Sequence, residues 1–412
     1  MNILYDCFSC SPYYGSDEGI GWMWPYLMKE YHDVWVLVRK DRRQDIEKYC
    51  RENAIKDIHF VYCDIPDLLN FYYYHKKRGE NGTLDFLLYQ FLWQFVAIKK
   101  AKKLHKTIHF DIVHHACTND FRLIGFMYQL NVPLIIGPIG GAQETPKALE
   151  IYIQDHYKRE KLRTIINRVM VSLPGYRKAL QKANKIFFSN IETLNYLLPL
   201  IQNSDKCSLL TEAGTINLED DSTIKQKNKK ICTFLWVGRM EYRKGLDLLI
   251  DVLQQLPLDK QWNIILCGDG SERKKLQNKC RLLDFSERIE FIGRISHNEI
   301  QKIYQSATVF VFPSLRETTG TVLIEAMSYG LPVICLKQGG AVNILNNLSG
   351  FLINVDSQKQ CVNQFADAME YCIDHPDIVA DMGQVAKKQV FQNCSWIKKI
   401  EFMNNIYAEI AK

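Results

Sequence analysis

The chain of 412 residues lacks any apolar run long enough to cross a lipid bilayer. Its longest nearly apolar stretch, Phe86–Ile98, has 13 residues, whereas a transmembrane helix needs about 20. The opening sequence MNILYDCF has no basic segment ahead of an apolar core, so we expect a β-strand there and not a secretory signal. We therefore expect a cytoplasmic protein that has no membrane-spanning helix.

Several nucleotide-binding and metal-binding patterns are also missing. There is no Walker sequence, which argues against a P-loop hydrolase, and no G-x-G-x-x-G loop, which argues against an NAD-dependent oxidoreductase.

The 13 cysteines are odd in number and lie mostly in apolar runs, which is typical of reduced, buried thiols. The pair Cys7 and Cys10 has redox spacing, but we favour two incidental cysteines. No second pair or histidine cluster completes a zinc site.

The positive charge of the chain is mild and confined to one half. Residues 1–206 hold 28 Lys and Arg against 22 Asp and Glu, and the remaining residues hold 24 of each. The whole net charge of +6 therefore comes from the first half. We expect that half to meet phosphates or an anionic membrane surface, and we expect no nucleic-acid partner.

Apolar, β-rich runs alternate with amphipathic helical patterns along the whole chain. Continuous runs such as VWVLVR and TVFVF are typical of strands that are buried on both faces of a parallel sheet. Between such runs, Leu246, Leu249 and Leu253 recur on one face of a predicted helix. This alternation predicts doubly wound α/β sheets.

A polar segment separates two predicted domains. Residues 217–230 are charged and poor in aromatic side chains, and each side of them has enough strands for its own sheet. We predict an α/β protein in which two Rossmann-like domains with doubly wound parallel sheets, residues 1–212 and 213–394, face a central cleft. The amphipathic residues 395–412 predict a final helix, and packing back onto the first domain is one option for it.

Two carboxylates stand out in the segment PSLRETTGTVLIEAMSYGLPV, Pro313–Val333. Glu317 lies in the loop after the strand TVFVF, and Glu325 lies about one turn into a helix that Gly330 should end. Ligands of open α/β sheets bind at such loops, and a helix N-terminus attracts anions. Glu317 could therefore accept hydrogen bonds from ligand hydroxyls, and Glu325 could hold a ribose. The alternative is a solvated Glu317 and a Glu325 that pairs with a neighbouring Lys or Arg.

A basic turn follows the strand that ends at Gly238. Arg239, Arg243 and Lys244 come directly before the next predicted helix. Three cations at such a turn can hold a diphosphate, since arginine offers a planar fork and lysine a point charge. The alternative is a solvated basic loop.

In the first half, glycines and histidines follow two predicted strands. Gly15, Gly19 and Gly21 predict a flexible strand-to-helix turn that admits a phosphate or a sugar ring, although their spacing departs from a dinucleotide loop. His114 and His115 end the strand FDIVHH, so one of them should point toward the cleft. The other would be a structural histidine.

Together these segments resemble the retaining GT-B glycosyltransferases of family 4, the group 1 glycosyl transferases, in their bacterial polysaccharide form. The resemblance covers nearly the whole chain and is strongest in VGRMEYRKG, CGDG and FPSLRETTGTVLIEAMSYGLPVI. The E-x7-E spacing of Glu317 and Glu325 is the family's signature. Many members read E-G-F-G at this point, whereas this chain reads Glu317-Thr318-Thr319-Gly320, which leaves the donor sugar open.

The resemblance implies roles in binding a nucleotide-sugar donor, with UDP as the favoured nucleotide. Arg239 and Lys244 would hold the diphosphate, and Glu325 would hold the ribose. Glu317, as a catalytic residue, would bind the sugar hydroxyls. The neighbouring donor-binding positions are Thr318, Thr319, Gly320 and Thr321.

In the first domain the resemblance implies that a histidine contacts the donor sugar. His115 is the favoured catalytic position, and His114 is the alternative. The turn at Gly19 and Gly21 would close on the donor phosphates.

The implied reaction moves a hexosyl group with retention, without a cofactor or a metal ion. No D-x-D sequence occurs, so we expect the basic turn and a helix N-terminus to stabilise the leaving diphosphate. No carboxylate nucleophile is evident, so front-face attack is preferred over the double displacement of retaining glycosidases.

The acceptor is expected to be a glycan or a lipid-linked sugar in cell-envelope synthesis. Residues 71–106 are aromatic with basic ends, and residues 156–182 form a second basic run. Both could rest peripherally on the inner face of the plasma membrane, or could simply cover the first sheet.

Three other functions remain open. A nucleotide-sugar epimerase of the same architecture would need no acceptor. An NAD-dependent oxidoreductase would need the missing glycine loop. A catalytically silent binding subunit would be expected to lack some of the residues named above.

Overall fold

The computed structural model describes all residues except 66–83, 217–230 and 412. The chain forms two compact α/β units. The first unit comprises Met1–Ala142, Arg163–Ala213 and Trp396–Lys412, and the second comprises Gln143–Leu162 and Gly214–Ser395. The predicted linker, residues 217–230, lies outside the described residues.

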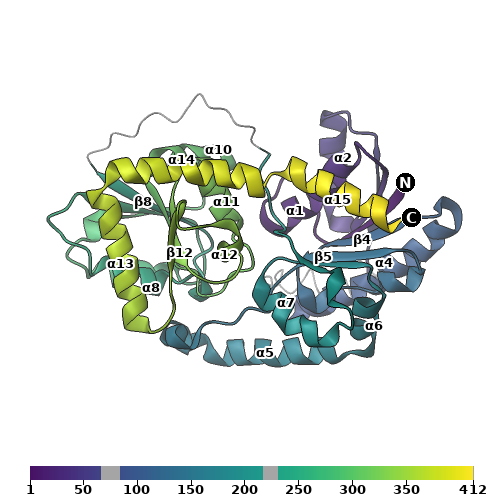
Figure 1. Ribbon diagram of the computed structural model, residues 1–412, viewed down its shortest axis with the longest axis horizontal. Helices are drawn as coiled ribbons and strands as arrows, with labels where there is room; N and C mark the ends of the chain where they lie inside the picture. Colours follow the sequence, from purple (N-terminus) through teal and green to yellow (C-terminus); the bar gives the residue numbers. More distant parts are fainter. Residues whose placement is uncertain (66–83, 217–230, 412) are drawn as a thin grey trace. The chain divides into compact units, whose positions relative to one another are not determined.

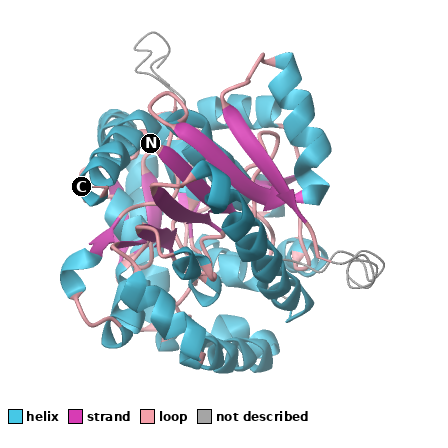
Figure 2. Ribbon diagram, turned by 90° about the vertical axis from the view of Figure 1, so that its right-hand side faces the viewer, coloured by secondary structure: helices cyan, strands magenta, loops and turns pink. Residues whose placement is uncertain are grey.

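The first unit is built on a seven-stranded parallel sheet, whose strands are magenta in Figure 2. The strand order is β3 (Ile58–Cys63), β2 (Asp33–Arg39), β1 (Asn2–Cys7), β4 (Ile112–Cys117), β5 (Leu134–Ile139), β6 (Lys185–Phe188) and β7 (Cys207–Leu209). From β1 the chain adds β2 and then β3 on one side of the sheet. It then returns to place β4 on the other side of β1, and β5, β6 and β7 follow outward from β4. The carboxyl ends of β1 and β4 therefore form the switch point, where open α/β sheets bind ligands.

Helices cover this sheet and complete its core. They are α1 (Ser16–Met28), α2 (Arg43–Glu52), α4 (Leu84–Ile108), α6 (Pro174–Lys182), α7 (Ile191–Leu197) and the second part of α5 (Tyr157–Ser172). In α4, Trp93, Ala97 and Ala101 recur every four residues and are fully buried. They pack in one cluster with Leu4 and Val113 of the strands. The described part of the aromatic stretch, residues 84–106, thus covers the first sheet.

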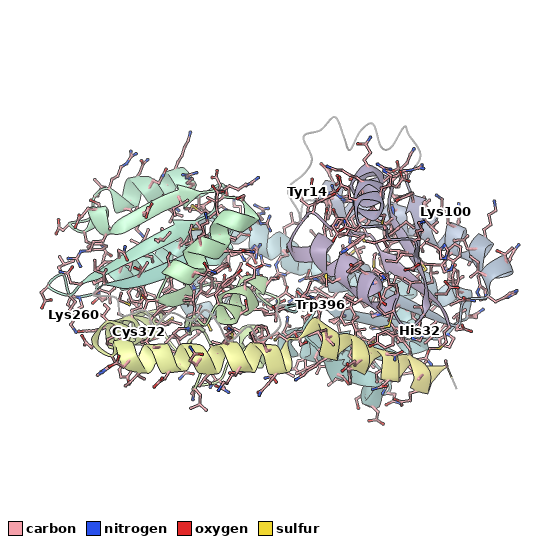
Figure 3. All side chains as sticks on the ribbon, turned by 90° about the horizontal axis from the view of Figure 1, so that it is seen from above. Tyr14, His32, Lys100, Lys260, Cys372 and Trp396 are labelled. Atoms are coloured by element: carbon pink, nitrogen blue, oxygen red, sulfur yellow. The ribbon has the colours of Figure 1, made fainter. Side chains whose placement is uncertain are left out.

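The last helix, α15 (Trp396–Ile410), belongs to the first unit (Figure 1). Trp396, labelled in Figure 3, meets the ring of Trp24 edge to face with centroids 5.2 Å apart, a geometry worth about 0.5–1.5 kcal/mol beyond burial. The Tyr407 hydroxyl lies 2.7 Å from that of Tyr5, and buried Lys399 donates a 2.6 Å hydrogen bond to the carbonyl of Thr211. Ring packing and buried hydrogen bonds therefore join this late segment to the first sheet.

The second unit contains a six-stranded parallel sheet with the same kind of order. Its strands run β10 (Ile289–Gly293), β9 (Trp262–Cys267), β8 (Cys232–Val237), β11 (Val309–Phe312), β12 (Val333–Leu336) and β13 (Gly350–Ile353). The switch point lies between β8 and β11, which pair through Phe234 and Val309. The two parallel sheets confirm the predicted pair of α/β domains.

Seven described helices flank this second sheet. They are α8 (Leu246–Leu253), α9 (Arg273–Cys280), α10 (His297–Ser306), α11 (Thr321–Ser328), α12 (Ala341–Ile344), α13 (Gln358–Asp374) and α14 (Pro376–Asn393). α8 packs with α13, and α11 packs with α14 (Figure 1). α11 ends as the sequence predicts, because Gly330, two residues after the last helical residue, adopts a left-handed φ of 70°.

One segment belongs to a different unit from the predicted one. Residues 143–162, counted with the first domain on sequence grounds, are part of the second unit. Leu149 and Ile153 are buried in the second unit's core, and the Tyr152 hydroxyl donates a 2.8 Å hydrogen bond to Asp251. Sequence order misplaced the segment, because these tertiary contacts join residues about 100 positions apart.

Within the described residues, no helix is both long and apolar enough to cross a membrane.

All 13 cysteines are free thiols. Cys7 and Cys10 are fully buried, and burial raises the pKa of both thiols. Reactive redox cysteines have a lowered pKa, so these two thiols are better explained as core side chains.

Candidate functional site

The second unit brings Lys244 and Glu317 together at its switch point. Lys244 follows β8, Glu317 follows β11, and the Lys244 ammonium group contacts the Glu317 carboxylate. Only 12% of the Lys244 side chain and 19% of the Glu317 side chain are exposed. Glu317 is therefore a partly buried ion-pair partner, and the solvated-loop alternative for it is wrong.

The charges at this pair are fixed by its surroundings. Burial would raise the pKa of the Glu317 carboxyl, but Lys244 and then Arg243 hold that pKa at about 2. Burial also lowers the pKa of Lys244, while the carboxylate opposes that change. The Glu317 carboxyl is thus ionised at neutral pH, and it offers a carboxylate beside the Lys244 side chain to a polar ligand.

The other two cations of the basic turn share one carboxylate. Glu241 Oε1 lies 2.9 Å from Arg239, and Glu241 Oε2 lies 2.8 Å from the Nε of Arg243. The Arg239 side chain is 51% exposed, whereas Arg243 is largely buried and reaches Glu317 at 3.8 Å. Sequence analysis missed Glu241, although an acid between two arginines in RMEYR is a visible sign of such a pairing.

Close backbone packing aligns the two loops that carry the pair. Gly245 has a φ of 70°, and a Cβ there would lie 2.0 Å from the carbonyl oxygen of Pro313. The amide of Leu315 donates a 2.9 Å hydrogen bond to the carbonyl of Arg243. Only glycine fits this approach, so Gly245 sets the position of Lys244 against the Glu317 loop.

A second glycine pair supports the Glu317 loop from another strand. Gly339 and Gly340 follow β12, and a Cβ on either would lie 2.4 Å from an atom of Glu317 or Thr319. The amide of Gly340 donates a 2.8 Å hydrogen bond to the carbonyl of Thr318. Sequence analysis missed these residues, and the G-G pair after a buried strand was the available signal.

The predicted donor-binding positions Thr318, Thr319, Gly320 and Thr321 lead into α11. Gly320 is the residue before the helix, with a φ of 78°. Thr319 is buried, and its hydroxyl has no hydrogen-bond partner among the described residues. The loop thus places a buried hydroxyl and a helix N-terminus beside Glu317.

Glu325 lies on α11, and its carboxylate accepts a 3.0 Å hydrogen bond from the Tyr304 hydroxyl. The Tyr304 ring is buried and stacks on the ring of Tyr329 at 5.3 Å. A polar partner was expected for Glu325, but its identity was not, because Tyr304 comes from α10, 21 residues earlier. The tyrosine hydroxyl thus orients the Glu325 carboxylate.

One more polar contact to the loop comes from the segment that sequence analysis misplaced. The amide nitrogen of Gln143 donates a 2.6 Å hydrogen bond to the carbonyl of Glu317. Arg316 pairs with Glu160 at 3.0 Å, and the Tyr242 hydroxyl donates a 2.6 Å hydrogen bond to the same carboxylate. No sequence pattern pointed to these partners.

The two histidines of the first unit differ in their surroundings. They lie within β4, two and three residues before its end, rather than at its end as predicted. His114 is enclosed by hydrogen bonds to the Tyr407 hydroxyl at 2.5 Å and to the carbonyl of Gly137 at 2.7 Å. Burial lowers its pKa to about 3, so His114 is the structural histidine. His115 instead pairs with Asp6 at 2.8 Å.

Gly19 and Gly21 do not form the predicted turn, because both lie in α1. A Cβ on Gly21 would lie 1.9 Å from the carbonyl oxygen of Ser9, and one on Gly19 would lie 2.6 Å from that of Tyr14. The glycines therefore let the loop after β1 pack against the helix. Contact of these two residues with a donor phosphate stays a prediction.

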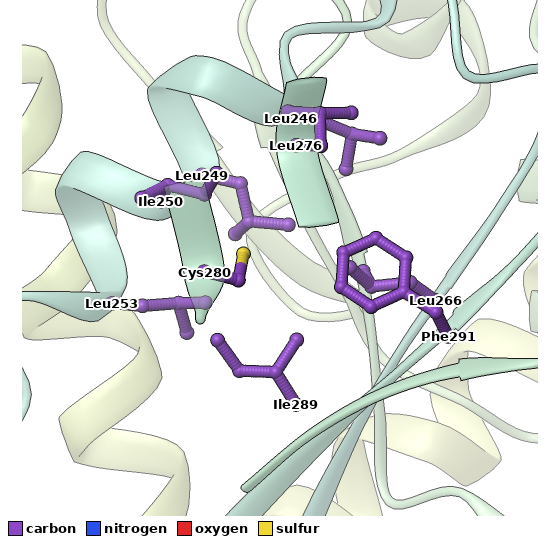
Figure 4. A pocket seen from close by; sticks show the side chains of 9 residues that line it. All are labelled: Leu246, Leu249, Ile250, Leu253, Leu266, Leu276, Cys280, Ile289 and Phe291. Atoms are coloured by element: carbon purple, nitrogen blue, oxygen red, sulfur yellow. The ribbon is translucent and has the colours of Figure 1, made fainter. Parts of the chain in front are cut away.

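An apolar void in the second unit is too small for a ligand (Figure 4). It measures about 10 Å³, which is close to the minimum for one water molecule. Its lining comes from α8, α9, β9 and β10 and consists of Leu246, Leu249, Ile250, Leu253, Leu266, Leu276, Cys280, Ile289 and Phe291. The void belongs to the core and not to the site.

Known proteins resemble the chain in sequence and in fold. The family model "Glycosyl transferases group 1" matches residues 218–389. An uncharacterised glycosyltransferase of Methanocaldococcus jannaschii is 27% identical over 199 residues, which are 47% of this chain and 48% of that protein. The chain spans about half the length of the curated relatives it matches.

The solved structures cover nearly the whole chain. Anabaena HepE in complex with UDP gives a TM-score of 0.64 at 17% identity, over 99% of this chain and 100% of that one. Sucrose-phosphate synthase from Thermosynechococcus elongatus gives 0.67 at 16%, over 99% and 98%. These likenesses establish the fold of both units. Residues 218–389 therefore match the glycosyl transferases group 1 family, and the chain has the fold of GT-B glycosyltransferase structures.

Proposed function

We propose that the protein is a retaining glycosyltransferase that moves a hexosyl group from a nucleoside-diphosphate sugar, most simply a UDP-sugar, to a glycan or lipid-linked acceptor. The observation that carries this proposal is the partly buried ion pair of Lys244 and Glu317 at the switch point, with Glu325 on the next helix. The domain match and the UDP complex of the Anabaena protein support the same reading. Synthesis of bacterial polysaccharide or cell envelope is part of the proposal.

The proposed roles follow from charge and position. Lys244 and the half-exposed Arg239 would neutralise the leaving diphosphate, whose charge grows as the glycosidic bond breaks. Glu317, held ionised, would accept hydrogen bonds from the sugar hydroxyls, and Glu325 would hold the ribose. Acceptor attack on the same face of the sugar, with the donor phosphate taking the acceptor's proton, gives retention without a metal ion.

An epimerase of the same architecture is not favoured, because the family match is to glycosyl transferases. The two reactions differ in their products. A transferase links the sugar to a second molecule and releases the nucleoside diphosphate, whereas an epimerase returns a nucleotide sugar. Analysis of the products formed from a UDP-sugar and a glycan acceptor therefore separates them.

Calorimetric titration tests the donor site directly. Without divalent metal, and with UDP, GDP, ADP and NAD tested in turn, we expect one nucleoside diphosphate to bind at micromolar concentration, with UDP as the favoured ligand. Glu325→Ala should weaken that binding about 10- to 100-fold, because a hydrogen bond to a charged group contributes about 1.5–3 kcal/mol. Glu370→Ala is the matched control, since Glu370 pairs only with a surface lysine, Lys260, at 2.7 Å among the contacts described. Binding of NAD alone, or equal loss in both variants, would contradict the proposal.

We further propose that the first unit meets an anionic membrane surface through α5. Ile165 and Val169, four residues apart on one face of this helix, are each 56% exposed. The part of α5 that belongs to the first unit also carries Arg163 and Arg168 and has no acidic residue. An apolar stripe beside cations fits the headgroup region of an anionic lipid layer. The protein would then work at the inner face of the plasma membrane, where a lipid-linked acceptor is present.

Vesicle sedimentation tests this surface. Replacing both Ile165 and Val169 by glutamate should lower binding to vesicles of anionic phospholipid about tenfold, through lost burial and added repulsion. Leu282→Glu is the control, because Leu282 is 86% exposed and lies in the second unit. If the double variant sediments like the wild type, or if neutral vesicles bind equally well, α5 is not the lipid contact.

A further inference from the structure

The first unit contains a buried acid and histidine at its own switch point. Asp6 of β1 and His115 of β4 are direct register partners on the two central strands. Their side chains are only 1% and 2% exposed, and His115 Nδ1 lies 2.8 Å from Asp6 Oδ2. The pair thus occupies the place where doubly wound sheets bind ligands.

Each member of this pair keeps one polar atom without a hydrogen bond. Within the described part of the chain, neither Asp6 Oδ1 nor His115 Nε2 has a partner, although both are buried. Leaving a buried polar group unpaired costs free energy, so such groups usually serve a ligand or hold bound water. His114, one residue away, has hydrogen-bond partners for both ring nitrogens. Of these two neighbouring histidines, His115 therefore has a ring nitrogen without a hydrogen-bond partner among the described residues, and His114 does not.

The hydrogen bond to Asp6 determines which ring nitrogen of His115 is left to contact a ligand. A carboxylate can only accept a hydrogen bond, so Nδ1 must carry the proton that it donates to Asp6. Nε2 is then the atom left for a ligand, with the ring held in one orientation. Gly125 keeps the neighbouring loop close, because a Cβ there would lie 3.3 Å from Asp6 Oδ2 and 3.6 Å from His115 Nδ1.

We propose that Asp6 is a positioning residue, which acts through His115 to present Nε2 to a hydroxyl group of the sugar substrate. The sugar contact rests on the proposed function, whereas the effect of Asp6 on the ring does not. Asp6 was not singled out in the sequence, because a lone acid inside the strand NILYDC resembles any buried polar residue.

Nitrogen-15 spectra of histidine-labelled protein test both parts. In the wild type we expect His115, assigned with His115→Gln, to carry a proton on Nδ1. Its Nε2 signal should move when a UDP-hexose is added, from a panel of UDP-glucose, UDP-galactose and UDP-N-acetylglucosamine, and should stay in place with UDP. In Asp6→Asn, which keeps the shape, the fixed tautomer and the response to the sugar should both be lost, while affinity for UDP is unchanged.

Two controls separate positioning from folding. Tyr5→Phe alters the adjacent residue of β1, whose hydroxyl contacts Tyr407, and should leave the His115 signals unchanged. If Asp6→Asn does not fold, the wild-type spectra alone test the role of Asp6, through the nitrogen of His115 that carries the proton. A proton on Nε2 alone, or an unchanged tautomer in a folded Asp6→Asn, overturns the role of Asp6. A UDP-hexose that binds without moving Nε2 overturns the sugar contact, whereas absence of any nucleotide binding in calorimetry overturns the proposed function with it.

Discussion

Replacing Lys244 by methionine is expected to lower the rate of sugar transfer about 10²- to 10³-fold, the usual loss when one stabilising charge or donor is removed from a reacting site. Methionine keeps the apolar stem that packs near the Phe312 ring, 5.8 Å from the Lys244 ammonium group. It removes the cation and leaves Glu317 buried without that partner. Steady-state kinetics with the nucleotide sugar that binds in calorimetry would measure the fall in kcat.

Lys260→Met provides the comparison for this variant. Lys260 also makes two ion pairs in the second unit, with Glu370 at 2.7 Å and Asp374 at 2.6 Å, but it plays no part in the proposed site. Exposed pairs contribute little, so its kcat should stay within twofold of the wild type. A similar loss in both variants would assign the Lys244 effect to general destabilisation.

Gly245→Ala should destabilise the second unit by about 3 kcal/mol or more. The new Cβ would lie 2.0 Å from the Pro313 carbonyl oxygen, and the φ of 70° is strained for any residue with a side chain. Left-handed strain costs about 1–3 kcal/mol, and overpacking adds a similar amount. Urea unfolding followed by the fluorescence of buried Trp236 would report the change.

Gly15→Ala is the matched control for this substitution. No atom lies within 4 Å of the Cβ position at Gly15, and its φ of −82° suits alanine. Its effect should stay within about 0.5 kcal/mol. If Gly245→Ala unfolds at the same urea concentration as the wild type, the loop at Pro313 is less constrained than its packing indicates.

The architecture and the second-unit motif could be predicted because their signals are local. Continuous apolar runs identify strands of a parallel sheet, and the glycine at position 330 marks the end of α11. Glu317 and Glu325 stand at a fixed spacing beside such signals. The fold of the second unit could therefore be read from sequence, while the roles of these residues toward a donor remain predictions.

The partners of these residues could not be predicted, because they arise from contacts distant in sequence. Lys244 and Glu317 are 73 positions apart, and Gln143 reaches the Glu317 carbonyl across 174. Gly19 and Gly21 suggested a turn, but tertiary packing against the loop after β1 favours helix at both positions. Such pairings depend on how the strands and helices are assembled, which single-sequence patterns do not encode.

The packing of α15 on the first sheet has a consequence for the order in which the protein is made. Residues 214–395 are synthesised before Trp396 and Tyr407, which cover Trp24, Tyr5 and His114. At about 5–20 residues per second, a ribosome leaves those side chains without their covering helix for roughly ten seconds or longer. The unit that emerges first is thus finished last, and its exposed aromatic surface is the part of the nascent chain that chaperones would have to protect.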